Sequence, residues 1–580
     1  MLLDTGNNIR QNRESIIDRT KKMAANLESA IRKIKDTTQD LGKNIYGHIN
    51  IPPKISAKCF LNGEDLKEYE KLVFKKKYPY LELNNFDTKL NPTNKNVRHN
   101  LGLQVMSNFN EPSVCEPNEE SINVEVFNRG LSGVAIPSKT TGLEGSIKNN
   151  LKETENIDER SSKYFNQNSK SLNIMELQCK VQNYEWGKIG PDSMVAKLVA
   201  SADPTASIDP TKPYAELWMG THPNGPSVII ERDINLSEYL KSNVDAIGPD
   251  VRKKFNVSVP FLLKVLSVRK ALSIQAHPTK EHAEELHKNF PDLYKDPNHK
   301  PELAIALTPF EGLCGFRPIS EIKNFINNLP ELRQILSDDS VNALLAHNGE
   351  GDMAELLRDV FQSLMTCDKN KVANGLDSLL NRLKTEDAST QTFLLYPLLK
   401  QLHSDYPGDV GCWAPYFMNF MQLRPGQAIF LKPNLPHAYL NGDCIECMAC
   451  SDNVVRAGLT PKQIDVPTLI GMLDYNSYHP SEMLFTPQLE DSNSCIWRPP
   501  VPDFAVVKIR VIVDSGDSYN TIVRPSPSII IVVSGTGEGC DTEPIALRPG
   551  VVIFLKASRQ LTISPALGEH VEAYQAICNV

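Results

Sequence analysis

The stretch ALSIQAHPTK, residues 271–280, brings together three side chains that could do chemistry. Ser273, Gln275 and His277 occur at alternate positions, and the preceding segment PFLLKVLSV is rich in residues that favour strands. Side chains two residues apart project from the same face of a strand. We therefore expect Gln275 and His277 to point the same way, toward water or toward a ligand that needs an amide and an imidazole.

Two further residues could complete a site with Gln275 and His277. They are Glu302, in NHKPELAIAL, and His437, in LPHAYL. Two imidazoles, a carboxylate and an amide oxygen suit a borderline cation such as Zn²⁺, with one position left open for water or substrate. Each residue alone also has a bland explanation, as a turn residue, a surface charge or a hydrogen-bonded core amide. Taken together, the four predict a metal site.

Three closely spaced cysteines are a second candidate for metal or redox chemistry. Cys444, Cys447 and Cys450 lie in GDCIECMAC, and a Cys-x-x-Cys pair is common to zinc and redox sites. A spacing of three, however, places successive thiols on opposite faces of a strand, and no second such pair follows. We therefore interpret these residues as partly buried structural thiols.

The bulk composition is that of an ordinary globular chain with several domains. The 580 residues carry a formal charge of −8, from 62 basic and 70 acidic residues, which gives no reason to expect nucleic acid as the main partner. The sequence offers neither a signal peptide nor an apolar run long enough to cross a membrane. Twelve scattered cysteines favour reduced thiols, so we expect a cytoplasmic location and no membrane partner.

Residues 1–173 differ in composition from the rest of the chain. They are rich in Asn, Lys, Glu and Ser and lack sustained apolar periodicity, which predicts a largely disordered extension. Within it, apolar residues recur every seven positions across residues 9–41, which is typical of an amphipathic helix. This helix could bind an unknown partner or could remain solvated.

From residue 174 onward, short β-rich runs alternate with Pro and Gly, which predicts a mainly β fold of many short strands. Across residues 320–406 the apolar spacing changes to three and four, which predicts a helical insert. The segments LRPGQAIFLK and LRPGVVIFLK, at residues 423–432 and 547–556, form an internal repeat. Only the first copy is followed by a histidine, His437, so we expect chemistry in the first unit alone.

Several long blocks, in order, resemble one enzyme family, the type I phosphomannose isomerases, across residues 174–580. The blocks are VQNYEWGK, AELWMGTHPNGPS, PFLLKVLSVRKALSIQAHP, HKPELAIALTPFEGLCGFRP, LPHAYLNGDCIECMACSDNVVRAGLTPK and DVPTL. The resemblance implies two cupin-type jelly-roll barrels with an inserted α-helical domain. The implied divisions are a catalytic barrel at 174–319 and 407–485, the helical insert at 320–406, and a C-terminal barrel at 486–580.

The resemblance also implies roles for named residues. One Zn²⁺ per chain would be held by Gln275, His277, Glu302 and His437. The catalytic residues would be Arg456, Glu446, Lys300 and Asp452, and the substrate would be bound by Ser273, Lys264, Lys462 and Trp186. Glu446 falls at the position of a proposed base, with an orienting or ion-pairing role as the alternative.

The implied activity is zinc-dependent interconversion of mannose 6-phosphate and fructose 6-phosphate through an enediolate. Such an enzyme supplies mannose phosphates for GDP-mannose and glycosylation, and a monomer is expected. Two alternatives are a cupin Fe(II) oxygenase and a non-catalytic sugar-phosphate-binding cupin. Gln275 disfavours the first, because it occupies a position that such oxygenases leave open. Glu446 and Arg456 disfavour the second.

Overall fold

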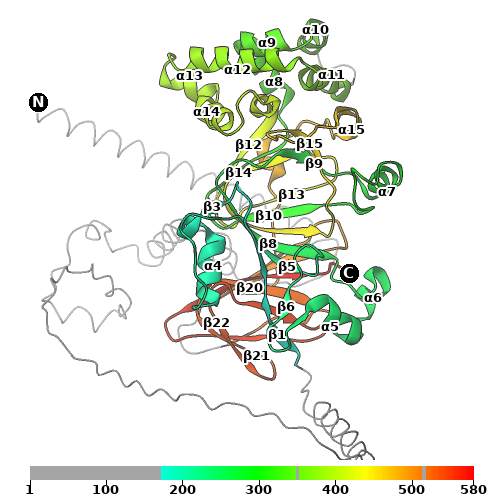
Figure 1. Cartoon of the computed structure of the whole chain (residues 1–580), viewed down its shortest axis with the longest axis vertical. Coiled ribbons are helices and arrows are strands. Elements are labelled where there is room, and N and C mark those ends of the chain that lie inside the picture. Colours follow the sequence, from blue (N-terminus) through cyan, green and yellow to red (C-terminus); the bar gives the residue numbers. More distant parts are fainter. Residues whose placement is uncertain (1–171, 348–351, 513–517) are drawn as a thin grey trace, which may run out of the picture. The chain divides into compact units, whose positions relative to one another are not determined.

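A computed structural model describes residues 172–347, 352–512 and 518–580 of the chain, and these form a mainly β fold (Figure 1). The expected disorder of the N-terminal extension and the helix expected at residues 9–41 lie outside the described residues. Leu172 and Asn173 are described. Leu172 packs against a hydrophobic core, and the Asn173 side chain donates a hydrogen bond of 2.7 Å to Asp541.

A ten-stranded antiparallel sheet carries most of the polar side chains singled out above. Its main path runs β12 (Met418–Leu423), β11 (Phe310–Phe316), β14 (His437–Ala449), β8 (Phe261–Val268), β5 (Glu216–Gly220) and β2 (Lys180–Gln182). Four more strands attach to it, namely β10 (Glu302–Ala306), β13 (Ala428–Leu431), β9 (Ile274–Ala276) and β15 (Val455–Gly458). All eight residues of β8 are buried, which explains its nearly continuous apolar sequence.

A nine-stranded sheet combines strands from the beginning and the end of the described chain. Its order is β16 (Gln488–Leu489), β17 (Ser494–Trp497), β18 (Ala505–Ile512), β25 (His570–Ile577), β20 (Ser528–Gly535), β23 (Val552–Leu555), β1 (Ile174–Gln178), β6 (Val228–Ile229) and β7 (Ile234–Asn235). Smaller sheets consist of β19 (Tyr519–Asn520), β24 (Thr562–Pro565), β21 (Gly537–Cys540) and β22 (Pro544–Leu547), and of β3 (Lys188–Ile189) and β4 (Pro213–Tyr214). Among the described strands, the pairings do not close a barrel, so the mainly β prediction holds while the cupin barrels remain unconfirmed.

Helices occupy most of the chain between β11 and β12. They are α8 (Ile319–Asn328), α9 (Pro330–Ile335), α10 (Asp338–Ala346), α11 (Met353–Met365), α12 (Lys369–Leu383), α13 (Ala388–Phe393), α14 (Tyr396–Asp405) and the 3₁₀ helix η4 (Val410–Tyr416). In α11, the buried residues Leu357, Val360, Phe361 and Leu364 recur at spacings of three and four, which gives the helix one apolar face. The Asp352 carboxylate caps its first turn by accepting hydrogen bonds from two backbone amides.

The remaining helices lie between the strands and are short. They are α4 (Met194–Ala202), α5 (Leu236–Ser242), α6 (Pro249–Phe255), α7 (Lys280–Asn289) and α15 (Val466–Met472). No helix among the described residues combines the length and the apolar character needed to span a bilayer.

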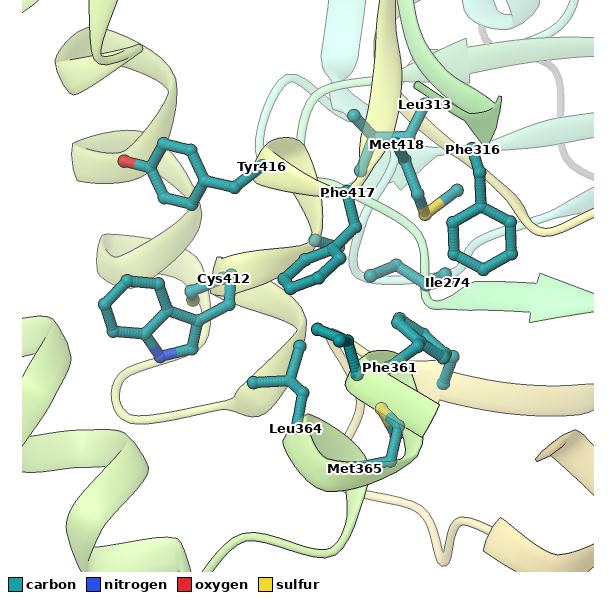
Figure 2. Packing of buried hydrophobic residues seen from close by; sticks show 14 of the residues in the cluster. Ile274, Leu313, Phe316, Phe361, Leu364, Met365, Cys412, Tyr416, Phe417 and Met418 are labelled. Atoms are coloured by element: carbon teal, nitrogen blue, oxygen red, sulfur yellow. The ribbon is translucent and has the colours of Figure 1, made fainter. Parts of the chain in front are cut away.

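The apolar face of α11 packs directly against the ten-stranded sheet. Figure 2 shows Phe361 close to Phe417 and Ile274, which come from the end of η4 and from β9. The Phe361 ring centroid lies 5.2 Å from that of Phe316 and 5.9 Å from that of Phe417. Because Ile274 adjoins Gln275 in β9, the helical segment and the candidate site share one continuous core.

The two copies of the internal repeat adopt the same local structure but meet different surroundings. Gly426 and Gly550 precede β13 and β23 with φ angles of +86° and +89°. A Cβ atom on Gly550 would lie 1.9 Å from the carbonyl oxygen of Leu198, whereas a Cβ on Gly426 would meet nothing within 4 Å. Arg548 donates to the carbonyls of Ser201 and Ala202 at the C-terminal end of α4, so the second copy is seated against this helix.

The Gly550→Ala variant is expected to be much less stable than Gly426→Ala. Both substitutions place a Cβ in left-handed backbone, a strain of about 1–2 kcal/mol, so Gly426→Ala measures that strain alone. Gly550→Ala also forces the chain away from α4, which adds about 1–3 kcal/mol of overpacking. Urea unfolding curves of the two variants measure the difference directly. Equal losses would show that the contact with α4 contributes nothing.

Candidate active site

An irregularity in the pairing of β14 allows side chains from both halves of this strand to line one cavity. The pairing of β14 with β11 shifts between Glu311, which faces Asn441, and Gly312, which faces Tyr439. One extra residue of β14 is accommodated there, and such a bulge reverses which alternate side chains face a given side. As a result Tyr439 and Glu446, an odd and an even position, both line the same cavity.

Three buried side chains converge as a candidate metal centre. The Nε2 atoms of His277 and His437 lie 3.3 and 3.2 Å from the two carboxylate oxygens of Glu302. All three residues are only 1% exposed, and their potential ligand atoms lie within 4.8 Å of one another. His277 follows directly after β9, His437 begins β14 and Glu302 begins β10, so three separate strands position the group.

Both imidazoles of this group are hydrogen-bonded through Nδ1 but not through Nε2. The Nδ1 atoms of His277 and His437 lie 2.7 and 2.9 Å from the backbone oxygens of Asn453 and Leu435. A carbonyl oxygen only accepts, so each Nδ1 carries the hydrogen and each neutral imidazole turns an Nε2 lone pair toward Glu302. Neither Nε2 atom has a hydrogen-bond partner among the described residues, and Glu302 Oε2 is likewise unpaired.

The charge states of His277 and Glu302 favour binding of a metal cation between them over binding of a proton. Burial lowers the pKa of His277 to about 4, so its imidazole is neutral at pH 7. Burial alone would raise the pKa of Glu302, but the positive charge of Lys300, 3.3 Å away, is among the causes that outweigh it and hold that pKa well below its usual value. Two imidazoles and one carboxylate thus lie around a common point, a donor set that fits a divalent cation such as Zn²⁺.

Gln275 lies beside this group. In β9 it pairs with His437 on one side and with Arg456 of β15 on the other. Gln275 also lines the cavity into which Glu302 points, so its amide is available to a ligand bound there. The strand expected across residues 273–277 is shorter than predicted, because β9 ends at Ala276 and His277 already belongs to the following loop.

The cavity beside the metal candidate has a volume of about 450 Å³ and mixed acidic and basic walls. Lys264 in β8 is directly opposite Glu446 in β14, and their charged atoms are 2.9 Å apart. Lys264 Nζ also lies 3.6 Å from Glu216, which accepts a hydrogen bond from the Trp218 indole. Neighbouring strands therefore place the Lys264 ammonium group close to the carboxylates of Glu216 and Glu446.

The electrostatics of this wall make Glu446 a proton acceptor of raised basicity. Burial raises the pKa of Glu446, and the charge of Lys264 offsets only part of this effect. For Lys264, burial disfavours the charged form, but Glu216 and Glu446 outweigh it and raise the pKa above its usual value. A protonated lysine therefore stands against a carboxylate whose affinity for a proton exceeds that of an exposed glutamate.

Arg456 and Asp452 lie on another part of the cavity lining. Arg456 is partly buried, and burial lowers the pKa of its guanidinium. Within the described part of the chain it forms no ion pair, so its charge is available to a ligand. Asp452 is half-exposed and lies 3.5 Å from Nε2 of the buried His222, and its other oxygen accepts a hydrogen bond from Asn224.

The structure places most of the predicted site residues around this cavity. Those that line it are Gln275, Glu302, Lys300, Lys264, Glu446, Asp452, Arg456 and Trp186. Ser273 and Lys462 are not among the lining residues. Ser273 lies just before β9, and Lys462 is exposed in the loop between β15 and α15.

Among the cavity residues that escaped the sequence analysis are Tyr439, Glu216, Trp218 and His222, and the first three carried a signal. Tyr439 follows His437 by two positions in a strand, and Glu216 and Trp218 alternate in the run AELW. The period of two already placed each of them on a chemically active face. His222 follows the end of β5, and nothing in its local spacing distinguishes it from a turn residue.

The cysteines of GDCIECMAC lie as the strand period predicts. Cys444 packs in the core next to the cavity and Cys447 in the core on the other side of β14. Both are buried free thiols whose pKa burial raises well above its usual value. They pack as small apolar residues on opposite faces of one strand.

Sequence comparison identifies one family. The catalytic domain of phosphomannose isomerase type I matches residues 174–319, and the helical insertion domain of the same family matches residues 334–418. The mannose-6-phosphate isomerase of Homo sapiens is 46% identical over 418 residues, which cover 70% of this chain and 98% of that protein. The Schizosaccharomyces pombe enzyme of the same name is 38% identical over 420 residues, 70% of this chain and 100% of that protein.

Solved structures give the same result. The apo form of mannose 6-phosphate isomerase from Salmonella typhimurium is 30% identical in sequence, with a TM-score of 0.60. The match covers 70% of this chain and 100% of that chain. A zinc-bound holo structure of mannose 6-phosphate isomerase matches with the same identity, coverage and TM-score.

Metal binding is expected to depend on His437 and not on His299, a histidine outside the metal candidate that pairs with Asp503. At a free Zn²⁺ concentration 100 times Kd, the unmutated chain should gain about 2.7 kcal/mol of unfolding free energy. His437→Ala should gain almost none, whereas His299→Ala should gain as much as the unmutated chain. Zinc analysis and thermal unfolding with and without metal measure this. A His437→Ala variant that retains full zinc would refute the site.

Proposed function

The chain belongs to the type I phosphomannose isomerase family, and from this premise we propose that it interconverts mannose 6-phosphate and fructose 6-phosphate through an enediolate in the cavity beside Glu302. The observation that carries the proposal is a single cavity lined by the carboxylate of the metal candidate, the buried Glu446 and Arg456, which forms no ion pair among the described residues. Aldose–ketose isomerisation needs these functions together, because a proton must leave one carbon while negative charge develops on two oxygens.

The metal would be Zn²⁺, one per chain, held by His277, Glu302, His437 and Gln275. A bound zinc ion supplies Lewis acidity to a sugar oxygen, which stabilises developing negative charge by several kcal/mol. The protein's own part is to hold the imidazoles by their Nδ1 hydrogen bonds, so that both Nε2 atoms face the cation.

Glu446 is the residue we propose as the base. It would take the proton from C2 of the open-chain aldose and return it to C1 of the enediolate, while the hydroxyl proton passes from O2 to the neighbouring O1, which yields the ketose. A well-placed base contributes about 10²–10⁴-fold to the rate when its pKa lies near the working pH. Burial among apolar neighbours moves the pKa of Glu446 in that direction, and its ion pair with Lys264 keeps the side chain oriented.

Arg456 and Lys300 would stabilise the negative charge of the enediolate. Arg456 has no carboxylate partner among the described residues, and its planar guanidinium can donate two parallel hydrogen bonds to adjacent oxygens. Lys300 Nζ lies 3.3 Å from Glu302, which places a second positive charge next to the metal candidate. Asp452 would help to orient ligands from the cavity rim, where it contacts His222.

The phosphate of the substrate would lie away from the reacting carbons. Ser273 precedes Gln275 by two residues, and Lys462 follows Arg456 by six, so both belong to segments that reach the cavity. We propose them as phosphate contacts, with Trp186 in the cavity wall. Lys264 is proposed instead as the partner of Glu446, because its ammonium group already lies 2.9 Å from the carboxylate of Glu446 and 3.6 Å from that of Glu216. Binding energy from the remote phosphate would help to orient the sugar.

We further propose that the enzyme supplies mannose phosphates for GDP-mannose, acts in the cytoplasm as a monomer and folds as two cupin-type barrels. A cupin Fe(II) oxygenase and a non-catalytic sugar-phosphate-binding cupin are the competing readings. Oxygen uptake in the presence of iron would favour the first. Binding of mannose 6-phosphate without turnover would favour the second.

Chelation is expected to abolish the isomerisation of mannose 6-phosphate, and added Zn²⁺ should restore it. The reason is that the buried carboxylate and imidazoles face one another without a hydrogen between them when the cation is absent. A coupled assay that detects fructose 6-phosphate measures this before chelation, after it and after metal is returned. Full activity in metal-free protein would contradict the proposal.

The Arg456→Ala variant is expected to lose about 10²–10³-fold in kcat while it keeps its zinc, because Arg456 contributes charge to the transition state and no ligand to the metal. Arg456→Lys should fall between the two, since a lysine keeps the charge but loses the planar pair of donors. Steady-state kinetics together with zinc analysis separate the effects. Unchanged turnover in Arg456→Ala would remove this residue from the mechanism.

A further inference from the structure

The segment that follows α14 forms hydrogen bonds next to both β9, which carries Gln275, and β15, which carries Arg456. We call residues 406–411 the connector, since they lead from the end of α14 into the first residues of η4. At one end, the Tyr406 hydroxyl donates a hydrogen bond of 2.6 Å to the carbonyl of Ala271, just before β9. At the other end, Asp409 bonds to the backbone just after β15.

Asp409 holds a backbone turn that no strand partner supports. One of its carboxylate oxygens accepts hydrogen bonds of 2.7 Å from the amides of Gly411 and Leu459, and the other accepts one of 3.2 Å from Thr460. Strand β15 ends at Gly458, so the amides of Leu459 and Thr460 lie beyond its ladder. A single carboxylate therefore satisfies three backbone donors from two separate segments.

The turn itself is strained, which shows that its surroundings determine its shape. Leu459 has a φ angle of +51°, in the left-handed region that a leucine rarely adopts. Gly458 packs against Gly411 so closely that a Cβ on Gly411 would lie 2.5 Å from the Leu459 amide nitrogen. Leu459 is also buried in the core, so Asp409 and this packing together hold the backbone in its strained conformation.

Arg456 is the residue that such a relaxation would move. It lies two positions before Gly458, opposite Gln275, at a point where the register between β15 and β9 already shifts. Since its guanidinium forms no ion pair among the described residues, only the backbone of β15 and its own packing fix its direction. The direction in which the Arg456 side chain points into the cavity thus depends on the turn that Asp409 holds.

We propose that Asp409 and Tyr406 are positioning residues, which hold the strands that carry Arg456 and Gln275 in the geometry that isomerisation needs. The inference rests on the proposed function, because it gives Arg456 a role at the reacting atoms. It also gives the helical segment a part in the chemistry, since the connector is continuous with its last helix, α14. Small errors in the position of a catalytic group lower rates by up to about 10²-fold.

The test compares Asp409→Asn with Asp405→Asn. The asparagine keeps one acceptor oxygen but replaces the other with an amino group, which cannot accept from a backbone amide. Asp405 is the matched control, because its carboxylate accepts from Gln401 within α14 and has no hydrogen bond to β15 among the described residues. We expect Asp409→Asn to lose at least 10-fold in kcat with unchanged zinc content, and Asp405→Asn to lose less than 2-fold.

A double-mutant cycle separates positioning from a merely structural effect. If Asp409 acts through Arg456, then Asp409→Asn should lower kcat far less in an Arg456→Lys background than in the unmutated chain. Additive losses would overturn the proposal, as would an unchanged kcat in folded Asp409→Asn. Should Asp409→Asn fail to fold, Tyr406→Phe, which removes one hydroxyl, decides the matter, and an unchanged kcat there overturns the proposal.

Hydrogen exchange keeps this inference separate from the proposed function. The amides of Leu459 and Thr460 should exchange at least 10-fold faster in Asp409→Asn than in the unmutated chain, while amides in the centre of β8 keep their protection. An unmutated chain without isomerase activity would refute the proposed function, but this measurement would still test whether Asp409 holds the turn. Unchanged exchange at both amides overturns the inference.

Discussion

The candidate site depends on one unfavourable contact, between a buried carboxylate and two imidazoles that have no hydrogen to offer it. The hydrogens of His277 and His437 are committed to backbone carbonyls on the far side of each ring. The buried Glu302 therefore faces two Nε2 lone pairs, and its Oε2 atom has no hydrogen-bond partner among the described residues. Such an arrangement persists only if a positive charge occupies the point at which the lone pairs meet. Lys300, on the same carboxylate, supplies part of that charge.

The sheet solves the problem of assembling this site from distant parts of the sequence. Every member lies in a strand or within a few residues of one, and β14 alone contributes His437, Tyr439 and Glu446. The bulge in β14 is what allows both halves of one strand to serve the same cavity. The raised basicity of Glu446 follows from its burial in this strand, an effect that the charge of its register partner Lys264 offsets only in part.

Much of this could be predicted from short-range patterns, and the exceptions have physical causes. The period of two indicated that Gln275 shares a face with chemically active side chains, and Gln275 lines the cavity. The same period indicated that Cys444 and Cys447 lie on opposite sides of β14. The change of apolar period near residue 320 marked the start of the helices, since helical spacing is a local property. The choice of ion-pair partner is different, because it is set by long-range register. Lys264 was expected to bind the substrate, and it does line the cavity, but its ion pair with Glu446, in a strand far later in the chain, could not be predicted from the sequence. His222 and the connector acquire their roles only through such tertiary contacts.

The position of β1 has a consequence for how the chain is made. This strand begins the described region, yet it pairs with β23 close to the C-terminus. At typical synthesis rates, roughly 20–80 s separate the emergence of the two strands from the ribosome. Throughout that interval one edge of β1 has no partner, and such an edge is a template for pairing with other chains. The nine-stranded sheet can thus be completed only after the long intervening stretch has been synthesised, and until then the free edge of β1 is open to other chains.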